Sequence, residues 1–597
     1  MCGIAGYIGK KNINRLNISN TLKLMQNRGP DNQQSLNFKF NDNNVYLLHS
    51  RLNIIDLHPR SNQPFSKKNF TIIFNGEIYN YLEIKKKLEK KGYKFKTASD
   101  TEVLLTLYME YQEKCTSYLE GMWAFAIWDN KNKKLFISRD RFGEKPLYIH
   151  ETDYGFYFGS EIKFISCLKN LPFDINYEKL KTYIQNGYKY LNYDTSTYFK
   201  NVSKLEKGTS LSIKKNKIFR HKYFIPNYKI DNSINYEEAL DILKTKLFRS
   251  VELRLRSDKD IAFCMSGGID STALASIARV IFNKKITTFS IIDKDKRYNE
   301  LTNINFMNKY LEADNQIIKL NKKYDLSELN ELIHYHESPV STISYFIHYL
   351  MTKKISENKF SVSFSGVGSD EIFTGYYHHY LAFLKNKKKN LKKEYSDWKK
   401  NYWPLIRNPN FKVKVNQIKN SVYSSESDFF IKKKKIHNFK YSNNELRNIM
   451  LNELNNQVVP VILEHDDKNS MFNSIENRSP YLDSDLVKFA NSIPTNFLIK
   501  NGYQKNILRE ILLGILPDKI RLDRKKVGFN SNIFSVFNKN SIKENYFSLI
   551  KNSFLNSIID FKKININQLI NNDKYRDETD KFLYALINVN FFLKKYE

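Results

Sequence analysis

A glycine-containing turn in the middle of the chain constrains the fold more than any other segment. Its residues, Ser266-Gly267-Gly268-Ile269-Asp270-Ser271, stand between the apolar run IAFCM and the helical run ALASIARVIF. The apolar runs ITTFSII and SVSFS follow, with helical patterns between them. Strand, helix and strand in succession predict parallel βαβ units and an α/β doubly wound sheet. We expect a nucleotide site at the carboxyl ends of its strands.

The 597-residue chain is longer than one hydrophobic core usually supports, so we expect at least two domains. The first 201 residues alternate short apolar runs with Gly, Asn and Asp, which predicts layered antiparallel sheets with helices between the strands. One such helix carries Tyr81, Ile84 and Leu88 at helical spacing and ends near Gly92. The predicted division is an α+β domain over residues 1–205, a linker over 206–235, and an α/β domain over 236–597 with a Lys-rich helical elaboration around 381–460.

Composition and sequence patterns indicate where the protein is found and which kinds of site it lacks. No run approaches the roughly 20 apolar residues of a membrane span, and the N-terminus lacks the pattern of a secretory signal. We therefore expect a soluble, cytoplasmic protein. Its four cysteines are too few and too scattered for a disulfide framework or a zinc site. The net charge of +33 is interpreted as a Lys- and Asn-biased surface rather than as a nucleic-acid interface, because no recognised binding motif accompanies the lysine runs.

Cysteine at position 2 is a candidate nucleophile. Loss of Met1 would leave a thiol and a free α-amine on one residue. An α-amine has a pKa of about 7.7–8.0, so it can accept the thiol proton near neutral pH without a histidine partner. On its own, an early cysteine is more often a small buried hydrophobe. The segments that follow Cys2 decide between the two interpretations.

Those segments form an ordered set. MCGIAGYIG is followed by NRGPD, HSRLNIID, QPF, FNGEIYN, ASDTEV, GMWAFAIWD and SRDRFGEKPLY. In that order they resemble the class II glutamine amidotransferase domain, an N-terminal-nucleophile sandwich of antiparallel sheets with helices. The resemblance implies that Cys2 attacks the amide of glutamine while Asn75 and Gly76 form an oxyanion hole. The glutamine-binding residues that it implies are Arg51 for the α-carboxylate, Asp100 for the α-ammonium, and Leu52, Asn53, Ile54, Ile55, Asn75, Gly76 and Glu77 around them.

Each of these residues also has a purely structural interpretation. Asn75-Gly76 is typical of a hairpin turn, and Arg51 is typical of a surface ion pair. Asp100 precedes the helical run TEVLLTLYMEY and is a candidate N-cap. The assignment rests on the combined pattern rather than on any one member.

The turn from Ser266 to Ser271 has its own chemistry. It offers backbone N–H groups and two hydroxyls at a helix N-terminus, which suits a pyrophosphate. Because it lacks the lysine of the GxxxxGK[ST] pattern, it favours cleavage between the α- and β-phosphates of ATP. The turn resembles the loop of N-type ATP pyrophosphatases, which implies Mg²⁺ ligands at Asp270 and Asp370. The implied ATP contacts are Met265, Ser266, Gly267, Gly268, Asp270, Ser271, Ile291, Ser365 and Gly366.

The resemblance extends along the second domain. MFNSIENRSPYLD, GYQKNILRE and RKKVGF are similar to segments of glutamine-hydrolysing asparagine synthetases. This implies that Lys505 meets phosphate and developing negative charge, where a lone lysine would otherwise be a solvated helix residue. The residues expected to bind and activate the acceptor carboxylate depart from the asparagine synthetase pattern. Val367 replaces a glutamate that contributes to aspartyl-adenylate formation in that family, and HESPVSTISYFIHYLM lacks the usual threonine–proline lead-in of the aspartate pocket.

These features predict an ATP-dependent carbon–nitrogen ligase that takes ammonia from glutamine, with asparagine synthesis as the leading activity. A sugar carboxylate is the alternative acceptor, because NSMFNSIENRSPYLD also resembles amidotransferases of surface-polysaccharide biosynthesis. A regulatory protein that binds nucleotide or RNA is disfavoured by the intact site residues, and a lactam-forming synthetase is disfavoured by Cys2. The expected partners are glutamine, ATP and a carboxylate acceptor, and a homodimer is compatible with the sequence.

Overall fold

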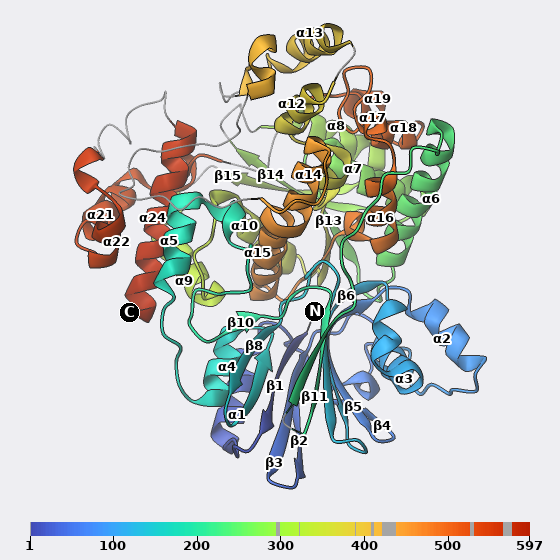
Figure 1. Ribbon diagram of the computed structural model, residues 1–597, viewed down its shortest axis with the longest axis vertical. Helices are drawn as coiled ribbons and strands as arrows, with labels where there is room; N and C mark the ends of the chain where they lie inside the picture. Colours follow the sequence, from blue (N-terminus) through green and yellow to red (C-terminus); the bar gives the residue numbers. More distant parts are fainter. Residues whose placement is uncertain are drawn as a thin grey trace.

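The computed structural model describes residues 2–215, 217–293, 299–320, 323–387, 390–406, 411–420, 438–525, 531–564 and 576–597. Met1 and the last four residues of RKKVGF therefore lie outside the described residues, as does part of the predicted Lys-rich elaboration. Two parts stand one above the other: a strand-rich N-terminal part and a mixed C-terminal part with helices around a second kind of sheet (Figure 1).

The N-terminal part contains two antiparallel six-stranded sheets. The first has the order β10-β8-β9-β1-β3-β2 and comprises β1 (Gly3–Gly9), β2 (Asn32–Phe40), β3 (Asn43–Arg51), β8 (Tyr148–Thr152), β9 (Gly155–Gly159) and β10 (Ser203–Lys204). The second has the order β12-β11-β7-β6-β5-β4 and comprises β4 (Phe65–Lys67), β5 (Phe70–Ile78), β6 (Gly121–Asp129), β7 (Lys134–Arg139), β11 (Thr209–Lys214) and β12 (Lys217–Lys222).

The two sheets pack face to face because their strands alternate side chains between two sides. Ile4 and Val45 of the first sheet share a buried cluster with Ile73 and Ala124 of the second. Helices cover the outer faces: α1 (Arg15–Leu24) and α4 (Ile162–Lys169) on the first sheet, α2 (Tyr81–Glu89) and α3 (Asp100–Tyr111) on the second. Helix α2 confirms the predicted helix at this position. The predicted N-terminal-nucleophile sandwich is confirmed.

The C-terminal part is built on a parallel five-stranded sheet of order β15-β14-β13-β16-β17. Its strands are β13 (Ile261–Cys264), β14 (Thr287–Asp293), β15 (Asp314–Leu320), β16 (Val362–Phe364) and β17 (Glu476–Arg478). Strands β14 and β15 lie on one side of β13, and β16 and β17 lie on the other. The chain direction across the sheet therefore switches between β13 and β16. In doubly wound sheets this switch point is where ligands bind.

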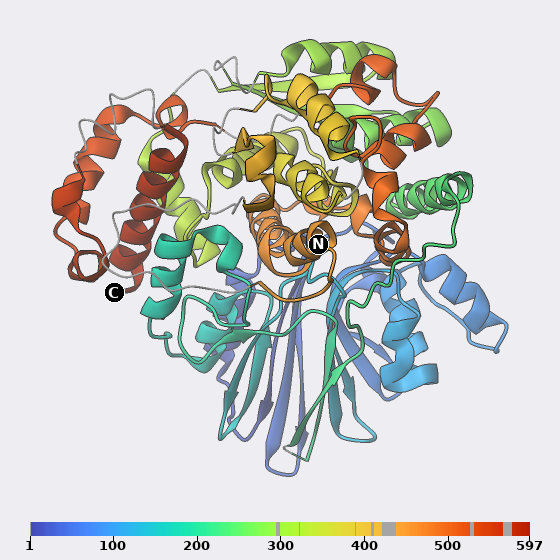
Figure 2. The ribbon, with the colours of Figure 1, turned by 45° about the horizontal axis from the view of Figure 1, so that its top comes forward.

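Helices surround this sheet and extend beyond it (Figure 2). They are α6 (Tyr236–Arg254), α7 (Ile269–Ser276), α8 (Leu301–Leu311), α9 (Leu326–His336), α10 (Ile343–Glu357), α11 (Ser369–Phe373), α12 (Tyr377–Lys385), α13 (Leu391–Tyr402), α14 (Glu445–Asn452), α15 (Val459–Phe472), α16 (Ser484–Ser492), α17 (Thr495–Leu498), α18 (Asn506–Ile511), α19 (Asp518–Arg521), α20 (Ile533–Val536), α21 (Lys539–Leu549), α22 (Ser553–Ile558) and α24 (Arg576–Tyr596). Helix α5 (Tyr177–Asn186) belongs to the N-terminal part. No helix in the described part of the chain combines the length and the apolar character that a membrane crossing needs.

The boundary between the two parts differs from the expected one. Strands β11 and β12 occupy much of the segment 206–235 that we expected to be a linker. Leu211 and Ile213 of β11 are buried in the cluster between the two sheets, so this hairpin completes the first domain. Only the segment that follows β12 connects it to α6.

The two domains also share a hydrophobic core. Helix α24, the last helix of the chain, packs against α5 of the N-terminal part and α9 of the C-terminal part (Figure 1). Tyr198 and Phe199 contact Phe592 of α24, with ring centroids 5.7 and 5.5 Å apart. The domains therefore meet through buried apolar surface, which holds them in a fixed relative position.

Candidate active sites

Cys2 lies immediately before β1 and is 8% exposed. Its backbone nitrogen donates to Asn75 Oδ1 at 3.2 Å, and its carbonyl accepts from Arg28 Nε at 3.1 Å. Burial raises the pKa of the Cys2 thiol, whereas the backbone of Leu52 and the charge of Arg51 lower it. The structure thus brings Cys2 together with three of the residues predicted around it.

Asn75 and Gly76 do not form a hairpin turn. Both lie within β5, paired with Ala124 and Trp123 of β6. Gly76 has φ +150°, and a Cβ there would lie 2.0 Å from the carbonyl oxygen of Met122, so only glycine fits. Asn75 Nδ2 is buried and has no hydrogen-bond partner among the described residues. An unpaired donor beside the nucleophile is what an oxyanion hole requires.

Arg51 ends β3 and is 4% exposed, which rules out a surface ion pair. Its Nη1 donates to His58 O at 3.1 Å and to Asn62 Oδ1 at 2.7 Å. Its Nη2 donates to Asp56 O at 2.5 Å and to Ile55 O at 3.5 Å. In this arrangement Arg51 holds the 55–62 loop, and a forked contact with a ligand carboxylate would have to replace some of these bonds.

The other predicted glutamine contacts line the same loop and reach the second domain. Asn53 N donates to Asp31 Oδ2 at 2.7 Å, and Asn53 Oδ1 is buried without a hydrogen-bond partner among the described residues. Leu52, Ile54 and Ile55 share a buried apolar cluster with Val362 and Met471 of the C-terminal domain. The segment that begins with Leu52 therefore connects the surroundings of Cys2 to the second domain.

Carboxyl groups of Asp100, Glu77 and Glu476 gather close to one another. Asp100 is the first residue of α3, and its Oδ2 accepts from Ile78 N at 2.9 Å. The N-cap of α3 is Ser99, so the interpretation of Asp100 as the N-cap is wrong. Burial raises the pKa of Asp100 to about 6. Burial also raises the pKa of Glu77 well above its usual value, and Asp100 and Glu476 add to this. One guanidinium, that of Arg478, lies 3.8 Å from Glu77 Oε1. The excess negative charge suits a ligand ammonium group.

The turn from Ser266 to Ser271 follows β13 and closes on itself. Ser266 N donates to Ser271 Oγ at 3.0 Å, and Gly268 N donates to Ser266 Oγ at 3.2 Å. A Cβ at Gly267 would lie 2.8 Å from Asn303 Cβ, so glycine is needed for the approach of α8. A Cβ at Gly366, in the turn after β16, would lie 3.2 Å from Asp270 Cβ. Two turns at the switch point thus face each other.

Lys505 joins the two turns. Its Nζ contacts Oδ1 of Asp270 and lies 2.5 Å from Oδ1 of Asp370. Ser369 Oγ also donates to Asp270 Oδ1 at 2.7 Å. Lys505 is 3% exposed with φ +55°, a strained backbone conformation for a non-glycine residue, so it is not a solvated helix residue. Two carboxylate oxygens that converge on one cation fit the oxygen ligands of Mg²⁺.

A pocket opens beside these groups. It is lined by the glycine turn together with Lys505, Arg509, Arg524 and Lys525. Four basic side chains and the backbone N–H groups of the turn suit an anionic ligand such as a chain of phosphates.

The remaining predicted ATP contacts are spread along the same sheet edge. Met265 N donates to Phe289 O at 2.9 Å, and Met265 is 2% exposed. Ser365 N donates to Arg478 O at 3.0 Å, and its Oγ accepts from Asn477 Nδ2 at 3.3 Å. Ile291 lies in β14 and packs against the apolar clusters on both sides of it. Met265 and Ser365 follow β13 and β16 and therefore border the switch point, whereas Ile291 lies one strand away in β14. Val367 packs against the core of the second domain.

Sequence reasoning missed a set of buried charged residues at the domain boundary. Arg28 bonds to Asp467 at 2.8 and 3.2 Å and to Glu161 at 3.1 Å. Arg478 bonds to Glu476 at 2.7 Å. Arg28 and Arg478 are both 0% exposed, which is unusual for arginine. Arg28 lies in the motif NRGPD and Arg478 in IENRSPYLD, but a single sequence does not reveal which partners the two arginines contact.

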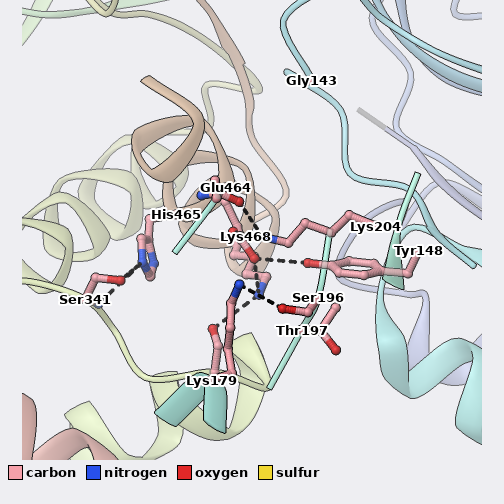
Figure 3. A network of polar contacts seen from close by, with 12 residues as sticks. Gly143, Tyr148, Lys179, Ser196, Thr197, Lys204, Ser341, Glu464, His465 and Lys468 are labelled. Atoms are coloured by element: carbon pink, nitrogen blue, oxygen red, sulfur yellow. Dashed lines mark hydrogen bonds and ion pairs between the residues drawn. The ribbon is translucent and has the colours of Figure 1, made fainter. Parts of the chain in front are cut away.

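A second group of polar contacts crosses the same boundary farther from Cys2 (Figure 3). Glu464 of α15 accepts from Lys204 Nζ at 2.6 Å and from the Tyr148 hydroxyl at 3.2 Å, both in the first domain. Next to it, His465 Nε2 lies 2.7 Å from Ser341 Oγ. Burial lowers the pKa of Lys204 to about 8 and that of His465 to about 3. Helix α15 is therefore attached to the first domain at several points.

Comparison with known proteins identifies the family. A model described as a glutamine amidotransferase domain matches residues 1–224, and one described as asparagine synthase matches residues 243–585. This chain belongs to the asparagine synthase family. Its relatives include asparagine synthetase [glutamine-hydrolyzing] 1 of Bacillus subtilis (strain 168), 30% identical over 560 residues, which are 89% of this chain and 87% of the relative.

Two further matches place the chain among its relatives. Asparagine synthetase [glutamine-hydrolyzing] 3 of the same organism is 28% identical, over 88% of this chain and 86% of that protein. Among solved structures, glutamine phosphoribosylpyrophosphate amidotransferase from B. subtilis aligns with a TM-score of 0.28 and 14% identity, over 53% of this chain and 65% of that chain. By its two family-model matches and its sequence relatives, the chain is an asparagine synthase-type glutamine amidotransferase.

Proposed function

We propose that this asparagine synthase family member transfers ammonia from glutamine to an ATP-activated carboxylate, with aspartate as the acceptor and asparagine as the product. The observation that carries the proposal is the pair Cys2 and Asn75. The buried side-chain amide of Asn75 holds the backbone nitrogen of Cys2 through Oδ1 and keeps Nδ2 unpaired among the described residues.

In the first half-reaction, the Cys2 thiolate attacks the side-chain carbonyl carbon of glutamine. The thiol proton passes to the α-amine that loss of Met1 would expose, and from there to the leaving nitrogen. A carbon–sulfur bond forms, the carbon–nitrogen bond breaks, and ammonia leaves. Negative charge on the oxygen is stabilised by Asn75 Nδ2 and Gly76 N–H. Water then hydrolyses the thioester to glutamate.

In the second half-reaction, an oxygen of the acceptor carboxylate attacks the α-phosphorus of ATP and displaces pyrophosphate. The turn from Ser266 to Ser271 binds the phosphates through its N–H groups, and Lys505 stabilises their developing charge. Asp270 and Asp370 would hold a Mg²⁺ ion, which would neutralise phosphate charge. Ammonia crosses between the domains and attacks the acyl adenylate, and AMP leaves.

A sugar carboxylate is the second candidate acceptor, and Val367 is the observation that favours it. An apolar side chain stands where a carboxylate would be expected for aspartyl-adenylate formation, and it packs into the core of the second domain. The chemistry of adenylation does not change, because any carboxylate needs a leaving group before ammonia can attack. Either acceptor implies the cytoplasm, where ATP and glutamine are available.

The deciding experiment measures pyrophosphate release from Mg²⁺–ATP with aspartate and with a panel of uronic acids, using ammonium or glutamine as the nitrogen source. We expect aspartate to give the highest rate. If pyrophosphate is released with a uronic acid but not with aspartate, the acceptor is a sugar carboxylate rather than aspartate. A Cys2→Ala variant should lose glutamine-dependent synthesis and keep ammonium-dependent synthesis, and loss of both would contradict the two-site scheme.

A further inference from the structure

A small cavity at the domain boundary lies among the polar contacts of Figure 3. The first domain contributes Lys179, Tyr198 and Lys204 to its lining, and the second contributes Glu464 and Lys468. None of the residues predicted for either active centre is among the described residues that line it. The cavity is therefore a separate feature of the boundary.

Three lysine side chains meet at this cavity. Lys179 of α5, Lys204 of β10 and Lys468 of α15 point toward the same region, and their side chains are 6%, 14% and 7% exposed (Figure 3). Lysine is almost never buried to this degree unless it is paired. Burial lowers the pKa of Lys204 to about 8, and the like charges of Lys179 and Lys468 contribute to this. The cavity therefore has an excess of buried positive charge.

The carboxyl groups nearby do not balance the three ammonium groups. Glu464 accepts from Lys204 Nζ at 2.6 Å and is the one buried carboxylate among them that stays ionised, since its pKa is well below the usual value. Asp194 accepts from Lys179 Nζ at 2.8 Å, but its side chain is 67% exposed, so water weakens this pair. Burial raises the pKa of Glu337, which also lines the cavity, to about 7, so this group is only partly ionised at neutral pH.

A buried hydroxyl without a partner belongs to the same lining. Tyr198 is 9% exposed, and its hydroxyl has no hydrogen-bond partner among the described residues. Burial raises the pKa of Tyr198 well above its usual value, and Tyr183 and Glu464 add to this, which places the hydroxyl near the charged groups. A buried hydroxyl that reaches no acceptor in the protein can donate to a bound anion.

The size of the cavity limits what it can hold. The centre of a water molecule can reach about 20 Å³ of it. By the same measure, one water molecule needs about 10–15 Å³. A single small ion fits in this space, whereas phosphate, sulfate and amino acids are larger.

We propose that this cavity binds one monovalent anion of the size of chloride. The anion lies among the ammonium groups of Lys179, Lys204 and Lys468 and accepts from the hydroxyl of Tyr198. Because Lys468 belongs to the second domain and the other three residues to the first, the anion holds the two domains together electrostatically. Its binding does not depend on the proposed activity, and both active centres form without it.

Thermal unfolding of the full chain in sodium chloride, sodium bromide and sodium gluconate at equal ionic strength tests this binding. Gluconate is too large for the cavity. We expect chloride and bromide to raise the midpoint by about 2 °C relative to gluconate, as a ligand at about 100 times its Kd would in a chain of this length. Crystals soaked in bromide should show an anomalous peak inside the cavity. Equal midpoints in the three salts, or bromide peaks only at the protein surface, would overturn the proposal, since the cavity would then hold water only.

Lys179→Met removes one of the three ammonium groups and should abolish the difference between chloride and gluconate. Lys163→Met is the matched control, because Lys163 Nζ crosses the same boundary to Tyr335 O at 3.0 Å and is not part of the lining. It should keep the full difference. If both variants lose the difference equally, the salt effect is a general property of the boundary and the proposal is overturned.

Tyr198→Phe removes only the unpaired hydroxyl, so it still decides the matter if Lys179→Met does not fold. The chloride concentration that gives half of the stabilisation should rise about tenfold, because one hydrogen bond to a charged group is lost. An unchanged concentration in Tyr198→Phe would show that the anion binds elsewhere, which would also overturn the proposal.

Discussion

Asn75 Oδ1 lies 3.2 Å from the backbone nitrogen of Cys2, while the Nδ2 atom of the same amide is buried without a partner among the described residues. One side chain thus fixes the nucleophile with its acceptor and keeps its donor for another group. This division of roles would be lost if the amide were shortened or replaced by a carboxylate.

Asn75→Ala should therefore reduce kcat for glutamine hydrolysis about 10²–10³-fold, because one oxyanion donor disappears. Ammonium-dependent pyrophosphate release should stay within about twofold of wild type, since the second domain is untouched. Both rates are measured on the same preparation. Asn37→Ala, on an exposed position of β2, is the control and should change neither rate. Unchanged hydrolysis in Asn75→Ala would remove Asn75 from the oxyanion hole.

Glutamine binding should weaken in acid. The raised pKa of Asp100, about 6, means that its carboxylate takes up a proton as the pH falls through that value. Only the ionised form can hold the ligand ammonium, so KM for glutamine should rise about tenfold for each pH unit below 6. Steady-state hydrolysis between pH 5 and 8 checks this.

Asp100→Asn provides the control for that pH profile. It should raise KM at pH 8 and remove the dependence near pH 6, because no titrating carboxylate remains at this position. If KM for glutamine in Asp100→Asn still changes with pH near 6, the titrating group is not Asp100.

Lys505→Met should reduce pyrophosphate release at least about 100-fold, because the cation that meets both phosphate charge and the carboxylates of Asp270 and Asp370 is lost. Glutamine hydrolysis without ATP should remain. Lys500→Met is a suitable control, since Lys500 is exposed and its Nζ lies 4.1 Å from the centroid of the Tyr236 ring. Retention of pyrophosphate release in Lys505→Met would contradict the role of Lys505.

Gly76→Ala should lower the free energy of unfolding by about 3 kcal/mol or more, since a methyl group would strike the carbonyl of Met122 in a conformation that already disfavours side chains. Gly92→Ala is the matched control. Gly92 also has positive φ, +87°, but has nothing within 4 Å of an added Cβ, so it should cost only about 1–2 kcal/mol. Denaturant titration of both variants compares the two. Equal losses would show that backbone conformation alone accounts for the cost.

Much of the architecture could be predicted because the hydrophobic and turn patterns of single segments match the strands and helices that the structure has there. The turn at Ser266 to Ser271 between a strand and a helix predicts the parallel sheet, and the structure has that sheet. The alternating strands of the first 201 residues predict the sandwich. The linker was placed too early because the hairpin of β11 and β12 is short and polar on one side, and only its packing against the sheet reveals where it belongs.

The site was predictable to a different degree in its two halves. The resemblance implied a shared Mg²⁺ site at Asp270 and Asp370, and in the structure both carboxylates contact Nζ of Lys505. The two turns can meet there because each follows a strand of one parallel sheet. The engagement of Arg51 with the 55–62 loop was not foreseen, since its partners are mainly backbone carbonyls with no sequence signature. Asp467 could not be paired with Arg28 because the two residues are 439 positions apart.

The aromatic contacts of Tyr198 and Phe199 with Phe592 have a consequence for how the chain unfolds. Helix α24 closes a core to which both domains contribute, in addition to the separate cores inside each domain. We expect this shared core to make the two domains unfold together. A calorimetric scan should then give one endotherm rather than two, and cutting off the final helix should make both domains prone to aggregate. We therefore expect the chain to unfold thermally as a single cooperative unit that carries two active centres.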